Sequence, residues 1–184
     1  MVSFARFIST TFATLNLAVF LLIACGWIGG SPLVGLVAAM ITAGVPAAVI
    51  ALGIRCGKLQ NRFIPDRRAR VLLAIISILA AATALCVLPM MGAPTLVYRA
   101  VLATMLAVAA VGIVSAWWKI SAHTTMASLV AVAVWSWTFW GVVAIAVVAA
   151  VATSRVILHA HTVWQVIAGV VLGGAIGLAF FVLA

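Results

Sequence analysis

Charged side chains are scarce in this chain of 184 residues, and their positions give the first indication of chemistry. Ten residues are Lys or Arg, one is acidic and three are His. Nearly all of them fall in three short breaks between apolar stretches, at residues 55–70, 119–123 and 155–161. Ionisable side chains at a bilayer boundary are costly and tend to be functional. Because almost all of these are cationic, an anion is the natural partner.

The residue types in these breaks favour binding and attack of a phosphate. Asp66 is the only acid of the chain, which excludes catalysis by a pair of carboxylates and a carboxylate-bound metal. The sequence has no glycine-rich phosphate loop. Cations, imidazoles and hydroxyls remain, and these groups bind phosphoryl oxygens and attack phosphorus.

The first two breaks place cations at expected helix starts, where main-chain N–H groups and the helix dipole favour an anion. Arg67 and Arg70 are three residues apart and would share a helical face. Lys119 and His123 lie on either side of Ser121, which is suited to cap the following helix. Taken singly, each pair also fits a plainer interpretation, which is a basic membrane anchor for the two arginines and a solvated histidine for His123.

The third break holds Arg155 and His161 on either side of a turn. His161 and Gln165 are four residues apart, so they would share one face of the helix that follows. His159, in the same turn, also fits a merely interfacial residue. Together the three breaks indicate one cationic site built from several helix starts.

The elements that must position these breaks are expected to be transmembrane helices. Apolar residues make up 68% of the chain, and long apolar runs cover most of it. We therefore expect an all-α, polytopic transmembrane helix bundle of six or seven spans, forming a single integral membrane domain over residues 1–184. The expected spans lie near residues 8–28, 33–54, 71–90, 98–118, 121–137, 140–154 and 161–184.

The stretch from Met126 to Thr153 has two interpretations, because no charge interrupts it. A single helix of that length would run about 42 Å, against a hydrocarbon core of about 30 Å. The tryptophan-rich segment 135–141 lies in its middle and ends in a glycine. Tryptophan favours the membrane interface, and glycine permits a turn. We therefore expect a tight hairpin of two short helices.

With that hairpin, two spans separate each break from the next, so all three breaks share one face with the N-terminus. Only Arg99 lies opposite to the other cations, which are Arg6, Arg55, Lys58, Arg62, Arg67, Arg68, Arg70, Lys119 and Arg155. The positive-inside rule would make the cationic face cytoplasmic. The net charge of +9 does not indicate nucleic acid, because the cations sit in short loops between spans. Anionic lipid headgroups would also attract them.

The motifs in these breaks resemble those of the type 2 phosphatidic acid phosphatase family of membrane lipid phosphatases. That family's third motif is Ser-Arg, five residues, His, three residues, Asp, and the same spacing is present here as Ser154-Arg155, His161 and Gln165. The second motif, Pro-Ser-Gly-His, corresponds to residues 120–123, and a shortened equivalent of the first lies at residues 66–70. The resemblance covers about residues 58–175 and is that of a divergent bacterial-type member.

The resemblance implies a metal-independent phosphatase that acts on a lipid phosphate or diphosphate, such as a polyprenyl phosphate, phosphatidate or phosphatidylglycerophosphate. It implies that His161 is the nucleophile, forming a phosphohistidine, and that His123 is the general acid. Gln165 would orient the nucleophile, and the phosphoryl oxygens would be held by Arg155, Arg67, Arg70, Lys119 and Ser121. The implied partners are the lipid substrate and the bilayer, with no nucleic acid, no metal and no organic cofactor.

Two other functions fit the same cationic face. One is a non-catalytic protein that binds or transports anionic lipids, and the other is a lipid phosphotransferase on the same fold. Gln165 is the main departure from the family pattern. The family's Asp orients the nucleophilic His and stabilises its charged form, whereas a Gln carbonyl accepts the same hydrogen bond without supplying a charge.

Overall fold

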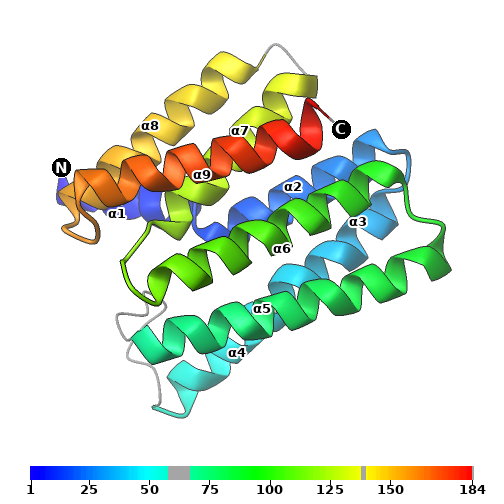
Figure 1. The fold of residues 1–184 in the computed structure, drawn as a ribbon, viewed down its shortest axis with the longest axis horizontal. Coiled ribbons are helices and arrows are strands. Elements are labelled where there is room, and N and C mark those ends of the chain that lie inside the picture. Colours follow the sequence, from blue (N-terminus) through cyan, green and yellow to red (C-terminus); the bar gives the residue numbers. More distant parts are fainter. Residues whose placement is uncertain (58–66, 138–139, 184) are drawn as a thin grey trace. The chain divides into compact units, whose positions relative to one another are not determined.

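The computed structural model describes residues 1–57, 67–137 and 140–183, and every regular element in these ranges is a helix (Figure 1). This confirms the predicted all-α class. The helices form two compact units, one built from residues 1–21 and 119–184 and the other from residues 22–118. The single integral membrane domain over residues 1–184 stays a prediction.

The first unit is built around one central helix. It contains the beginning of α2 and four complete helices, α1 Val2–Thr11, α7 Ala122–Trp137, α8 Gly141–Ile157 and α9 Val163–Phe181. α7 contacts both α8 and α9, while α1 packs on α8. α8 and α9 run in opposite directions (Figure 1), so the end of α8 and the start of α9 meet near the start of α7 at one end of the unit.

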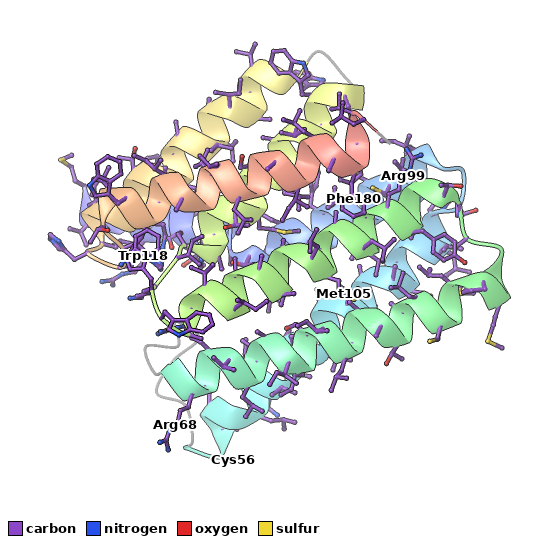
Figure 2. The ribbon with its side chains drawn as sticks, viewed as in Figure 1. Cys56, Arg68, Arg99, Met105, Trp118 and Phe180 are labelled. Carbon is purple, nitrogen blue, oxygen red and sulfur yellow. The ribbon has the colours of Figure 1, made fainter. Side chains whose placement is uncertain are left out.

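The second unit contains the remainder of α2 and the long helices of the middle of the chain. The bounds of its elements are α2 Thr14–Ile28, α3 Pro32–Ala39, the π-helical turn η1 Met40–Gly44, α4 Val45–Arg55, α5 Arg67–Val87, the 3-10 turn η2 Leu88–Met91 and α6 Thr95–Ser115. α5 packs against α6 and against η1. Arg68, in the first turn of α5, has its side chain pointing away from the helices, whereas Arg99 lies at the opposite end of this unit (Figure 2).

Within the described residues, four helical stretches are long and apolar enough to cross a membrane, or five if α1 and α2 form one bent span. The four match the predicted spans 33–54, 71–90, 98–118 and 161–184, and their bounds are Pro32–Arg55, Arg68–Met91, Thr95–Ser115 and Val163–Phe181. α7 and α8 are shorter, with 16 and 17 residues. At 1.5 Å per residue each is about 25 Å long, less than the hydrocarbon core of about 30 Å.

The predicted hairpin is confirmed, because α7 and α8 are separate helices that pack against each other. The tip of the predicted turn, residues 138–139, lies outside the described residues. The indole ring of Trp135 covers the start of α8 so closely that a Cβ on Gly141 would overlap it. Glycine at this position therefore lets the tryptophan pack on the neighbouring helix.

The predicted first span, 8–28, is wrong in one respect, because the chain breaks between α1 and α2. The two helices are bent by 41° at this break. The Asn16 side chain donates to the carbonyls of Thr10 and Thr11, at 3.2 and 3.0 Å. These carbonyls at the end of α1 lack helical partners, so the asparagine amide stabilises the break.

α9 packs on α7 through a stripe of three buried glycines, Gly169, Gly173 and Gly177. A Cβ on Gly169 would lie 2.7 Å from the carbonyl oxygen of Ser121, and one on Gly173 would overlap the carbonyl of Thr125. Small residues at this spacing let two helix backbones approach closely. The stripe therefore fixes how the start of α9 lies against the start of α7.

Replacing Gly173 with alanine is expected to force α7 and α9 apart, because the new Cβ would meet main-chain atoms. We expect a loss of about 1–3 kcal/mol in the free energy of unfolding, measured by thermal unfolding in detergent. Gly174→Ala is the matched control, since its nearest neighbour is the rotatable Ser128 hydroxyl at 3.3 Å. Equal stability of the two variants would show that the close approach is unimportant.

Candidate active site

The turn between α8 and α9 explains the spacing between Arg155 and His161. The N–H of His159 donates to the carbonyl of Val156 at 2.9 Å, and the N–H of Ala160 donates to the carbonyl of Arg155 at 3.1 Å. This pair of bonds is the Schellman motif, which ends a helix by reversing the chain. The N–H of His161 also donates to the Arg155 carbonyl, at 3.3 Å. The five intervening residues therefore bring His161 back to Arg155.

His159 occupies the left-handed position of this turn, with φ of 50°. Glycine adopts this conformation without the steric cost of a Cβ. We expect His159→Gly to raise the free energy of unfolding by about 0.5–1 kcal/mol and His159→Val to lower it, as measured by thermal unfolding. A lower stability of the glycine variant would contradict this structural role for His159.

The start of α9 fixes the Gln165 side chain. The Thr162 hydroxyl accepts from the Gln165 N–H at 3.4 Å, and Gln165 Oε1 accepts from the Thr162 N–H at 3.1 Å, which forms a capping box. A main-chain N–H can only donate, so this bond identifies the facing amide atom as the oxygen. The capping box thus determines the orientation of the amide.

The same Gln165 Oε1 lies 3.3 Å from His161 Nδ1. A carbonyl oxygen can only accept, so His161 Nδ1 carries the proton. Nε2 of the neutral ring then keeps its lone pair and is the atom able to attack an electrophile. Although Gln165 supplies no charge, it selects the ring tautomer that a nucleophilic histidine needs.

The pKa of His161 is lowered from its ordinary 6.5 to about 4. The main cause is burial, which disfavours the charged ring, and the charges of Arg155 and Lys119 act in the same direction. The hydrogen bonds of the ring to Gln165 and to the Lys119 main chain oppose this shift. His161 is therefore neutral near pH 7, as a nucleophile must be.

The start of α7 is joined to the α8–α9 turn. The Ser121 N–H donates to the carbonyl of Gln165 at 3.3 Å, and Lys119 Nζ donates to the carbonyl of Ala160 at 2.8 Å. Ser121 is fully buried and accepts from the Thr124 N–H at 3.5 Å, which confirms its predicted capping role. The second and third breaks therefore meet at one end of the first unit.

Arg155 is a buried cation, with only 6% of its surface exposed. Its Nη1 donates to the Ser9 hydroxyl at 2.6 Å, and Ser9 is itself fully buried. The motif's serine, Ser154, instead donates to the carbonyl of Val151 at 2.7 Å within its own helix. A buried cation is costly unless an anion balances it. A guanidinium oriented in this way is a suitable ligand for phosphoryl oxygens.

His123 lies at the first turn of α7 and is half-buried. Its Nδ1 is 3.4 Å from the Thr14 hydroxyl, and its ring also hydrogen-bonds the Ser9 main chain. Arg155 and His161 are close enough for their charges to act on the His123 ring. Two imidazoles and a guanidinium thus share one end of the first unit.

The structure brings together six of the eight predicted site residues. These six, all in the first unit, are Lys119, Ser121, His123, Arg155, His161 and Gln165. Arg67 and Arg70 belong to α5 of the second unit, where Arg70 is half-buried and the Arg67 side chain lies outside the described residues. Their role in binding phosphate stays a prediction.

Three residues of the site were not predicted from the sequence, namely Ser9, Thr14 and Thr162. A run of hydroxyl and amide side chains interrupts the first apolar stretch between Ser9 and Asn16. That run is the signal that points to the first two residues. Thr162 is visible as the first residue of a Thr-x-x-Gln capping box.

Comparison of the chain with protein-family models, curated proteins and solved structures finds no match.

Proposed function

We propose that this protein is a metal-independent membrane phosphatase that hydrolyses a lipid phosphate or diphosphate through a phosphohistidine. The observation that carries the proposal is the environment of His161. Its ring is neutral near pH 7, its Nδ1 proton is held by Gln165, and Arg155 and His123 lie within electrostatic range. The motif spacing that resembles lipid phosphatases points to the same residues.

In the proposed first step, His161 Nε2 attacks phosphorus in line with the bond to the lipid oxygen. The N–P bond forms as the P–O bond breaks, and His123 gives a proton to the departing oxygen. In the second step water attacks phosphorus, the N–P bond breaks, and His123 takes a proton from the water. The products are the dephosphorylated lipid and inorganic phosphate.

Arg155 and Lys119 supply the positive charge that such a transfer needs. Phosphoryl transfer depends mainly on positioning and on electrostatic stabilisation of the equatorial oxygens. Arg155 is anchored by Ser9, and Lys119 is held next to the His161 turn by its bond to Ala160. The buried Ser121 contributes mainly by holding the start of α7. The motif resemblance adds Arg67 and Arg70 to the proposed phosphate ligands.

A substrate embedded in a bilayer suits the apolar helices of this chain. We propose that α7 and α8 also cross the membrane as a tight hairpin, which completes the six or seven spans. The site would then lie at the boundary on the cytoplasmic side, where a lipid phosphate is found while its acyl or prenyl chains remain among the helices. The polar headgroup, and not a soluble metabolite, is therefore the proposed target.

The test is release of inorganic phosphate by the purified protein in detergent with EDTA. The substrates are phosphatidate, a polyprenyl diphosphate and phosphatidylglycerophosphate, each supplied in mixed micelles. We expect release from at least one of them, undiminished by EDTA. Binding of all three without release would favour an anionic-lipid binding or transport protein. Product that forms only with an added alcohol would favour a phosphotransferase.

A further inference from the structure

The break between α1 and α2 lies beside the two groups that the proposed reaction needs besides His161. Ser9, near the end of α1, holds Arg155 through its hydroxyl, and Thr14, the first residue of α2, lies 3.4 Å from His123. Both contacts join the N-terminal segment to residues more than one hundred positions away in the sequence.

The main-chain carbonyls at the end of α1 show why the break matters. The last four carbonyls of a helix lack helical partners. The Ile8 carbonyl accepts from the Phe12 N–H at 2.9 Å, and those of Thr10 and Thr11 accept from Asn16. His123 hydrogen-bonds the Ser9 main chain. Since the Ser9 N–H belongs to the helix, its carbonyl is the group left for the imidazole.

A helix that continued through residues 12 and 13 would use the Ser9 carbonyl for its own ladder. The break therefore makes an acceptor available to His123.

We propose that residues 9–14 are a positioning element of the phosphatase reaction. The Ser9 hydroxyl fixes the Arg155 guanidinium, while the Ser9 carbonyl and the Thr14 hydroxyl fix the His123 imidazole. This inference rests on the proposed function and adds the N-terminal segment to the site. The two hydroxyls act through different groups, so their loss has different consequences.

Ser9→Ala is expected to impair binding of the phosphoryl group. Arg155 would keep its charge but lose the hydrogen bond that orients it. We expect inhibition by vanadate, a phosphate analogue, to weaken about tenfold, with kcat/KM falling by a similar factor for every substrate. Ser3→Ala, on the exposed side of the same helix, is the matched control. Ser9→Cys keeps the side-chain size if the alanine variant folds poorly.

Thr14→Val is expected to impair proton donation to the leaving group. The measurement compares a lipid phosphate, whose alkoxide leaves poorly, with p-nitrophenyl phosphate, whose phenolate leaves readily without a proton. We expect kcat to fall about tenfold for the lipid and to change little for the aryl phosphate. Thr83→Val, the same substitution at an exposed position of α5, is the control and should affect neither substrate.

The outcomes separate this inference from the proposed function. The inference alone would be overturned if the wild-type protein turns over substrate but two results fail to appear. These are weaker vanadate inhibition in Ser9→Ala and a larger effect of Thr14→Val on the lipid phosphate than on the aryl phosphate. Failure of the wild-type protein to release phosphate from either substrate would overturn the proposed function together with the inference. A purely structural role for Thr14 would lower kcat for both substrates alike, and this result also counts against the inference.

Discussion

Replacing His161 with alanine is expected to reduce phosphate release to the uncatalysed level, a loss of at least ~10⁴-fold in kcat. The reason is that the variant has no atom in the place of Nε2 to attack phosphorus, although Arg155 and Lys119 remain to bind the substrate. The measurement is inorganic phosphate released from a lipid phosphate in EDTA, at saturating substrate. KM should change far less than kcat, because the phosphate ligands are intact.

The control for this experiment lies two residues away. His159→Gly removes another imidazole from the same turn but keeps the left-handed backbone that His159 adopts. It should retain the wild-type kcat. A covalent intermediate adds an independent measurement, since labelled lipid phosphate should leave an acid-labile, base-stable phosphoryl group on the wild-type protein and none on His161→Ala. Undiminished phosphate release by His161→Ala would show that His161 is not the nucleophile.

Changing Gln165 to glutamate is expected to have the second-largest effect. Glutamate fits the capping box of α9 and accepts the same bonds from Thr162 and His161, so the local fold should persist. The added carboxylate stabilises the charged imidazole that develops as His161 attacks. We expect kcat to rise at least about tenfold, since loss of the carboxylate in a Ser-His-Asp triad costs ~10⁴-fold.

The same substitution gives a pH signature. His161 attacks only when neutral, so kcat/KM falls as the pH drops below the pKa of the free enzyme, which is about 4 for this ring. A carboxylate at position 165 raises that pKa, so the acid limb of the profile should move to higher pH. Both proteins are measured on one substrate, so that the substrate's own ionisation cancels.

A leucine at position 165 completes the series. It removes the acceptor for the Nδ1 proton, and the ring then loses its fixed tautomer. We expect kcat to decrease in the order Glu, Gln, Leu at position 165. Thermal unfolding of each variant shows whether loss of the Thr162–Gln165 capping bond has also lowered its stability. A leucine variant as active as the wild type would show that Gln165 does not orient His161.

Local patterns predicted much of this molecule. The long apolar helices, the α7–α8 hairpin and the Ser121 cap depend on hydropathy, tryptophan placement and capping chemistry, which are properties of short segments. The contact between His161 and Gln165 was predicted from their spacing of four residues on one helical face. In the structure His161 lies before the N-cap of α9, and the capping box directs the Gln165 amide towards it.

The parts that escaped prediction depend on contacts between distant segments. The hydroxyl of Ser9 reaches Arg155 because α1 packs on α8, and that of Thr14 reaches His123 from the start of α2. No local pattern encodes either contact. The break at residues 12–13 was also missed, because an apolar stretch of suitable length was interpreted as one span. Its stabilisation by Asn16 is visible only when the carbonyls at the end of α1 are counted.

The turn between α8 and α9 has a consequence for recognising relatives. Its hydrogen bonds allow no insertion or deletion between Arg155 and His161, because one residue more or fewer would move the imidazole away from the guanidinium. A relative that keeps this site should have a residue tolerant of positive φ at position 159, a hydroxyl at 162 and Gln or Glu at 165. This combination defines a search pattern whose every constraint has a stated physical cause.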